Sequence, residues 1–250
     1  MMRRQFYMTL PSNSSMDLFP SNTLSNFKVK LPEMVNLSGE WEVGLSSITF
    51  PHSWYSITKE NQTFFLDRGN GVFLPAQINK GYYKNGKEVV EAISQTIRKN
   101  GIDGIILDYK EVSEKIDFKV KSKRRIAFEN HLALLLGFEY KKVIIEKNMS
   151  TPFVCDLNAG FQSLFIYLDI IDAQIVGDTR VPLLCTVPAG GKDGEVITIN
   201  YNNPQLMPLS RKEFETIEVL ITDDKGEKVS FQRGRVLVTL NFRLSQSPYF

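Results

Sequence analysis

The chain has 250 residues, and its 30 Lys and Arg residues against 28 Asp and Glu residues give a formal charge of +2. Proteins that bind duplex DNA through their overall charge carry a large basic excess, so this balance excludes that class. With 42% hydrophobic and 23% charged residues, the composition is typical of a globular protein of one or two domains and excludes intrinsic disorder.

Residues suited to covalent or metal chemistry are scarce. The two cysteines, Cys155 and Cys185, are too few for a disulfide framework, and the two histidines, His52 and His131, are too few for a histidine-rich zinc site. The longest apolar runs fall far short of the ~20 residues of a membrane helix, and no apolar segment of a secretory signal follows the basic N-terminus. We therefore expect a soluble, intracellular protein without cofactor, metal, membrane or small-molecule substrate.

The beginning of the chain predicts an arm followed by strands. Residues 11–20 are rich in Ser, Asn and Pro and predict a loop or an extended arm. Apolar and polar residues alternate in residues 27–31 and 41–50, which predicts two strands. Residues 62–67 and 72–78 flank an Asn-Gly turn and predict a β-hairpin.

Between residues 81 and 140 the hydrophobic period changes, which predicts an inserted module. A helix is predicted over residues 87–99, because Asn85 and Glu88 have the spacing of a capping box and Asn100-Gly101 is a stop signal. The elements predicted after this helix are two short strands, residues 105–109 and 116–120, and a short helix, residues 129–136.

Short β-branched and aromatic runs, separated by turns, resume in the second half. The predicted strands there are residues 163–171, 173–176, 181–187, 196–201, 217–222 and 236–244. The last of them alternates most clearly, so one of its faces is expected to lie in a core. Together with the strand of residues 41–50 it supplies the predicted core signature: Trp41, Val43, Leu45, Val236, Val238 and Leu240.

The sequence thus predicts a mainly β protein, a sandwich of antiparallel sheets with a small α-β-β-α insertion. Residues 1–80 are expected to supply the N-terminal arm and the first strands. Residues 81–140 form the predicted insertion, and residues 141–250 supply the remaining strands of a single domain.

The sequence contains no nucleophile elbow, phosphate-binding loop or zinc-protease helix, so we expect no enzyme and assign no catalytic residue. Both cysteines lie in apolar or β-rich runs, which favours buried thiols. His52 lies near Trp54 and Tyr55 and has two interpretations. It either titrates at an interface or is held by local hydrogen bonds at a turn that ends a strand, and the second is favoured.

The one conspicuous charge cluster consists of Lys119, Lys121, Lys123, Arg124 and Arg125. Such a cluster contacts the phosphates of nucleic acid or serves as a nuclear import signal. The alternative, a solvated strand end, is favoured because acidic neighbours partly neutralise it. A β-protein with 17 Phe and 9 Tyr residues and no chemical centre is expected to act through its surface, by assembling.

Four blocks of sequence, in order along the chain, carry a family resemblance. They are residues 37–54, which begin Leu-Ser-Gly-Glu-Trp-Glu-Val-Gly-Leu; residues 132–138, which end in Leu-Leu-Gly-Phe; residues 187–195; and residues 208–240. These blocks resemble the minor capsid (penton) proteins of Polinton, or Maverick, transposable elements. The resemblance implies a single jelly-roll β-sandwich, in which eight strands form two facing sheets.

The resemblance also implies a function. A penton is a structural virion protein whose homopentamer forms the vertex capsomer of an icosahedral viral capsid, beside a double jelly-roll major capsid protein. The implied partners are further copies of the chain, the major capsid protein and packaged DNA, which Arg3 and Arg4 of an arm over residues 1–26 would meet. The implied location is the virion, after assembly in the host cytoplasm or nucleus. The alternative function is a jelly-roll module that binds a ligand or receptor, as attachment and lectin-like proteins do.

Overall fold

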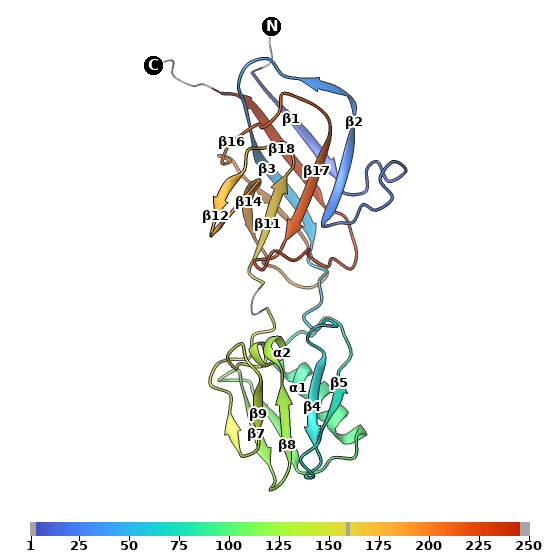
Figure 1. The fold of residues 1–250 in the computed structure, drawn as a ribbon, viewed down its shortest axis with the longest axis vertical. Helices are drawn as coiled ribbons and strands as arrows, with labels where there is room; N and C mark the ends of the chain where they lie inside the picture. The colour runs from blue at the N-terminus through green and yellow to red at the C-terminus, as the bar shows by residue number, and fades with distance from the viewer. Residues whose placement is uncertain (1–3, 159–160, 246–250) are drawn as a thin grey trace. The chain divides into compact units, whose positions relative to one another are not determined.

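The structure of the protein is a computed structural model that describes residues 4–158 and 161–245 (Figure 1). The chain forms two compact units. Residues 1–54 and 160–250 form the first unit, and residues 55–159 form the second.

The first unit consists almost entirely of strands. Their bounds are β1 Gln5–Pro11, β2 Asn26–Asn36, β3 Trp41–Pro51, β11 Ser163–Leu168, β12 Gln174–Val176, β13 Thr179–Val181, β14 Leu183–Pro188, β15 Val196–Asn200, β16 Met207–Pro208, β17 Glu213–Thr222 and β18 Leu237–Leu244. One antiparallel sheet has the order β1-β18-β3-β15, with β16 also beside β3, and the other has the order β14-β11-β17-β2. The hairpin β12–β13 stands apart from both sheets.

The eight strands in these two sheet orders have the connectivity of a jelly roll. The chain passes from β1 in one sheet to β2 in the other and back to β3, and it later passes from β14 to β15, β17 and β18 in the same alternating manner. The predicted sandwich of two antiparallel sheets, and the single jelly roll that the resemblance implied, are confirmed.

The core of the first unit lies between the two sheets. The six residues of the predicted core signature all belong to this apolar cluster, and none exposes more than 9% of its surface. Strands β3 and β18 bring them together, because Leu45 lies opposite Leu240 and Ile48 lies opposite Val238.

Residues 5–11 form β1, where an arm was expected. This strand pairs with β18 along its full length. Phe6, Met8 and Leu10 pack against the core of the sandwich, and this burial favours a strand over a solvated arm. The prediction of an arm over residues 1–26 is therefore wrong for residues 5–11, which form a strand of the sandwich.

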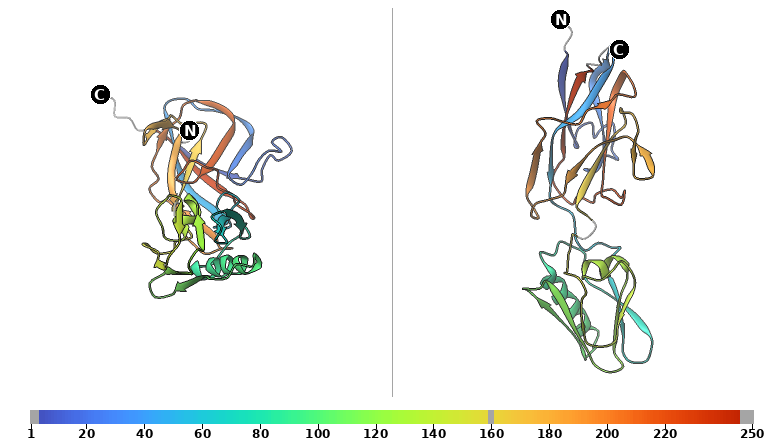
Figure 2. Two further views of the ribbon diagram at one scale, coloured as in Figure 1. Left: turned by 60° about the horizontal axis from the view of Figure 1, so that its bottom comes forward. Right: turned by 90° about the vertical axis from the view of Figure 1, so that its left-hand side faces the viewer.

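The second unit has two antiparallel sheets, two helices and a separate apolar core. Its elements are β4 Thr63–Asp67, β5 Phe73–Gln77, α1 Gly86–Lys99, β6 Ile105–Lys110, β7 Lys115–Val120, β8 Arg125–Phe128, α2 Asn130–Leu135, β9 Val143–Ile145 and β10 Met149–Ser150. One sheet has the order β5-β4-β8-β9 and the other β10-β7-β6. Helix α1 packs against β6 of one sheet and β5 of the other and shares the core of the unit (Figures 1 and 2).

The second unit extends beyond the expected insertion of residues 81–140. Strand β4 pairs with β8, so the predicted hairpin β4–β5 belongs to this unit. Strand β10 pairs with β7 and brings the chain after residue 140 into it as well. Helix α1 begins as predicted, because the Asn85 side chain accepts a hydrogen bond of 3.1 Å from the amide of Glu88. Within the described ranges, α1 and α2 both fall short of what a membrane-spanning helix requires.

Candidate functional site

The histidine of the first unit lies in an aromatic cluster just after β3. His52 is buried, and its ring centroid lies 4.0 Å from that of Trp54, which in turn meets the ring of Phe161 edge-on at 4.7 Å. The backbone amide of His52 donates to the carbonyl of Glu195 at 2.8 Å. Burial lowers the pKa of His52. These contacts favour a residue that organises the end of β3, whereas Tyr55 is half-buried at the start of the second unit.

Neither cysteine has the properties of a nucleophile. Burial raises the pKa of both Cys155 and Cys185 to about 12, so both thiols are protonated at neutral pH. In the described part of the chain, no group of three or more His, Cys, Asp and Glu side chains is placed to hold a metal ion.

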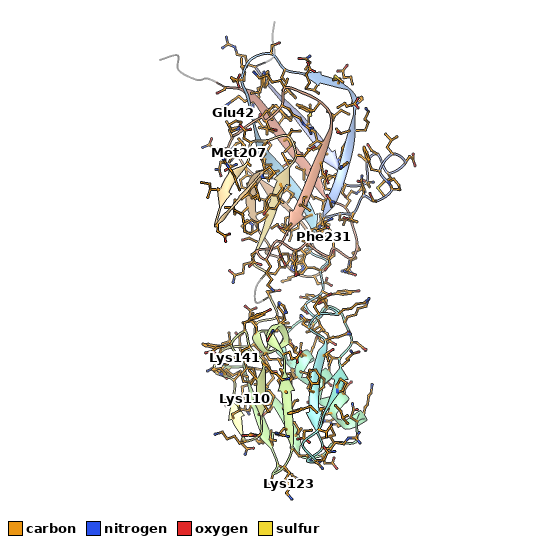
Figure 3. All side chains as sticks on the ribbon, in the orientation of Figure 1. Glu42, Lys110, Lys123, Lys141, Met207 and Phe231 are labelled. Atoms are coloured by element: carbon orange, nitrogen blue, oxygen red, sulfur yellow. The ribbon has the colours of Figure 1, made fainter. Side chains whose placement is uncertain are left out.

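The basic cluster of the sequence lies at the connection from β7 to β8. Lys119 is on β7, Arg125 begins β8, and the other three residues form the turn between these strands; Figure 3 shows Lys123 at its tip. Only Arg125 has an ion-pair partner, Asp67, among the described residues. Arg3, which was expected near packaged DNA, lies outside the described residues.

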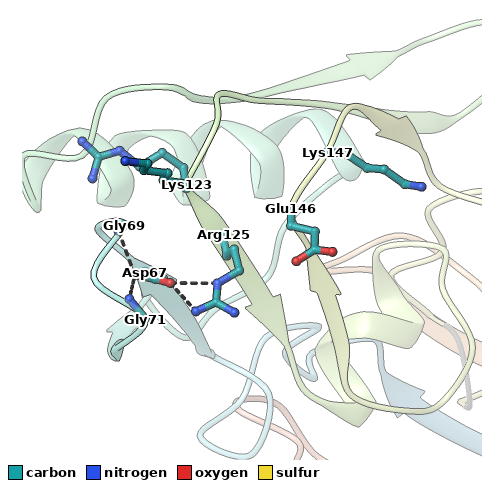
Figure 4. Close-up of a pocket in the computed structure, with 8 residues that line it drawn as sticks. Asp67, Gly69, Gly71, Lys123, Arg125, Glu146 and Lys147 are labelled. Atoms are coloured by element: carbon teal, nitrogen blue, oxygen red, sulfur yellow. Dashed lines mark hydrogen bonds and ion pairs between the residues drawn. The ribbon is translucent and has the colours of Figure 1, made fainter.

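Three members of the cluster line an open pocket of about 420 Å³ (Figure 4). The complete lining is Asp67, Gly69, Gly71, Lys123, Arg124, Arg125, Glu146 and Lys147. Lys119 and Lys121 do not reach it. Lys147 was missed by the sequence analysis, because it follows β9 and only the pairing of β9 with β8 brings it near the basic turn.

Asp67 is the buried anchor of this pocket. Its side chain is 1% exposed and accepts from Arg125 through both Nε, at 2.8 Å, and Nη2, at 2.6 Å. Its other oxygen accepts from the amides of Gly69, at 2.8 Å, and Gly71, at 3.1 Å. Burial alone would raise the pKa of Asp67, but these hydrogen bonds outweigh it and the pKa lies below its ordinary value. The negative charge of Asp67 is thus neutralised by hydrogen bonds from Arg125 and from the turn between β4 and β5.

Hydrogen bonds also join the three connections around the pocket. The Arg124 side chain donates to the carbonyl of Arg68 in the β4–β5 turn. The amide of Val120 at the end of β7 donates to the Asn148 side chain at 2.8 Å, next to Lys147. The pocket is therefore held by its own framework and can present cationic groups to an anion.

The chain is similar to a known protein in fold but not in sequence. No family model matches the sequence, and no curated protein is similar to it by sequence. The crystal structure of the selenomethionine-labelled mavirus penton protein matches with a TM-score of 0.56 at 11% identity. The chain has the fold of this penton protein. The match covers 96% of this chain and 99% of the mavirus penton chain, so it includes both units and not the jelly roll alone. At this identity the likeness is one of fold.

Proposed function

We propose that this chain is a penton, a minor capsid subunit whose homopentamer forms the vertex capsomer of an icosahedral capsid, and that it is not an enzyme. The observation that carries the proposal is the fold match with the mavirus penton protein over 96% of the chain. Its partners in the virion are other copies of itself and a double jelly-roll major capsid protein. Packaged DNA is a further contact on the inner side of the shell.

The edges of the sandwich are suited to such an assembly. Five copies around an axis require a heterologous interface that closes into a ring, and the flanks of a sandwich are available for it because its inner faces form the core. Three of the four edge strands carry an exposed large apolar residue: Tyr7 on β1, Met34 on β2 and Val196 on β15, which is 70% exposed. The hairpin β12–β13 adds Ile175, which is 80% exposed. Exposed apolar groups on edge strands favour contact with another chain.

The mass of the purified chain in solution tests this proposal. Light scattering behind a sizing column is expected to give a species near five times 28.5 kDa. Val196→Asp, on the edge strand β15, is expected to shift this species toward the monomer. The matched control is Val112→Asp, which places the same charge at a fully exposed turn of the second unit.

A monomer would require a second experiment with the major capsid protein. Co-assembly into shells with filled vertices would support a penton that closes only against its facet partners. A chain that stays monomeric and is left out of such shells would overturn the proposal in favour of a ligand-binding jelly roll.

A further inference from the structure

The basic excess of the chain is confined to one of its units. Residues 55–159 contain 17 Lys and Arg residues against 13 Asp and Glu residues, a net charge of +4. The remaining residues contain 13 against 15, a net charge of −2. Although the net charge of the whole chain is small, the second unit carries enough excess positive charge to attract anions.

Several cations without an ion-pair partner in the described ranges lie around the pocket at the ends of β4, β7 and β9. Elsewhere in the unit some cations are paired, as Lys87 is with Glu111 at 2.8 Å and Lys110 is with Asp108 at 2.6 Å. Others, such as Lys80 and Lys99, are not paired within the part of the chain that the structure describes. Glu146 is the single exposed carboxylate of the pocket lining. The cations here that have no ion-pair partner among the described residues are Arg68, Lys121, Lys123, Arg124 and Lys147.

The backbone at the pocket is held in a conformation that lysine rarely adopts. Lys123 has φ +67°, in the left-handed region. Its carbonyl lies close to Gly69, where an added Cβ would be 3.1 Å from that oxygen. Left-handed residues other than glycine persist only where the surroundings hold them, and they gather at binding sites. Lys123 is therefore fixed at the pocket at some cost in backbone energy.

Two aromatic rings on β4 and β5, the strands that lead to and from the Asp67 turn, indicate which kind of anion the pocket binds. The Arg125 guanidinium covers the ring of Phe73 at 5.0 Å, and Lys142 covers the ring of Phe65 at 5.4 Å. Both rings already have a cation on one face, whereas proteins that bind single-stranded nucleic acid offer aromatic rings for base stacking. A net charge of +4 is also modest for a duplex-binding unit. A polyanion recognised through its charges alone fits better, and a pocket of about 420 Å³ has room for a charged sugar.

We propose that this pocket binds a sulfated polysaccharide, with a sulfated sugar residue held between Lys123, Arg124 and Lys147. The inference concerns the second unit alone and does not rest on the proposed function. Binding can therefore be tested whether the purified chain is a pentamer or a monomer. Polysaccharide sulfates carry a fixed negative charge and accept hydrogen bonds from ammonium and guanidinium groups.

Binding of the full chain to heparin tests the proposal. The probes are heparin, chemically desulfated heparin, and single-stranded and duplex DNA of matched length at one salt concentration. The pocket variant combines Lys123→Asn, because Asn tolerates left-handed φ, with Lys147→Gln. The control variant combines Lys87→Gln with Lys110→Gln, which removes the same charge from the same unit away from the pocket. Far-UV circular dichroism checks that both variants are folded.

We expect heparin to bind the wild-type chain, and the pocket variant to bind it about tenfold more weakly or worse. The control variant is expected to stay within about twofold of wild type, since exposed paired lysines contribute little to binding elsewhere. Equal losses in the two variants would show an effect of net charge only and overturn the proposal. Unchanged binding of the pocket variant, or equal binding of desulfated heparin, would overturn it too. Tighter binding of either DNA probe would assign the pocket to nucleic acid instead.

Discussion

Trp41 is the largest side chain of the predicted core signature, and it is anchored at both ends. It is 9% exposed, its ring centroid lies 5.4 Å from that of Phe6, and its Nε1 donates to the carbonyl of Ser38 at 3.0 Å. Trp41→Ala removes a buried aromatic group and a hydrogen bond, and we expect it to lower the free energy of unfolding by ~3–5 kcal/mol. Denaturant titration followed by fluorescence of the remaining tryptophan, Trp54, measures this loss. Leu18→Ala, at a 63% exposed residue of the same unit, is the control, and a midpoint shift for Trp41→Ala no larger than that of the control would contradict the prediction.

His52 gives the first unit a dependence on pH. Burial lowers its pKa in the folded chain below the ordinary value of 6.5, although the charges of Asp193 and Glu195 oppose this effect. The unfolded chain therefore binds the proton more readily, and stability is lost as the pH falls from about 6.5 through the folded pKa. We expect the urea midpoint reported by tryptophan fluorescence to decrease across this window, and His52→Gln to flatten the decrease. An identical slope in the variant would assign the effect to other groups.

At the scale of single elements, Gly137 ends helix α2 in a position that excludes a side chain. It has φ +91°, and an added Cβ would lie 2.4 Å from the carbonyl of Phe153. Gly101 also has a positive φ, +66°, but no atom lies within 4 Å of its added Cβ. We expect Gly101→Ala to cost about 1–2 kcal/mol from backbone strain alone, and Gly137→Ala to cost more because the turn must also move. Urea unfolding followed by far-UV circular dichroism compares the stability of the two variants, since α1 and α2 both lie in the second unit. Equal losses of stability would show that the Phe153 carbonyl moves away from the added Cβ at no energetic cost.

The elements that the sequence predicted well are long and periodic. Strands β3 and β18 have 11 and 8 residues, long enough for apolar and polar residues to alternate visibly in the sequence, and α1 has 14 residues with a cap at each end. The missed strands β8, β9 and β10 have only 4, 3 and 2 residues, too few to show a period. Strand β1 did carry a signal, the alternation of Phe6, Met8 and Leu10. It was overlooked because its partner, β18, lies at the other end of the chain.

The candidate site was only partly predictable for the same reason. Lys123, Arg124 and Arg125 are adjacent in the sequence and were recognised as a cluster. Asp67 and Lys147 reach them only through the pairing of β8 with β4 and β9. Non-local pairing of this kind leaves no local pattern in the sequence, so the pocket itself could not be foreseen.

At the scale of the whole molecule, the apolar cores of the two units share no residue. If each core is sufficient for its own unit, replacing residues 55–159 by a short Gly-Ser linker will leave the first unit folded. Because Trp41 and Trp54 both belong to this unit, we expect the tryptophan emission of the shortened chain, and its cooperative loss in denaturant, to match the full chain. An unfolded or molten product, with emission shifted toward that of free tryptophan, would contradict the prediction.

The position of β18 has a consequence for how the chain matures on the ribosome. This strand lies between β1 and β3 and is hydrogen-bonded to both, so neither of them can complete its pairing until β18 has been synthesised. The second unit is contiguous in sequence and can fold while the first still waits for its final strand, because domains fold as units during synthesis. On a polysome, incomplete sandwiches on neighbouring ribosomes would expose unpaired strand edges that can pair with one another. Completion of this sheet thus follows the folding of the second unit.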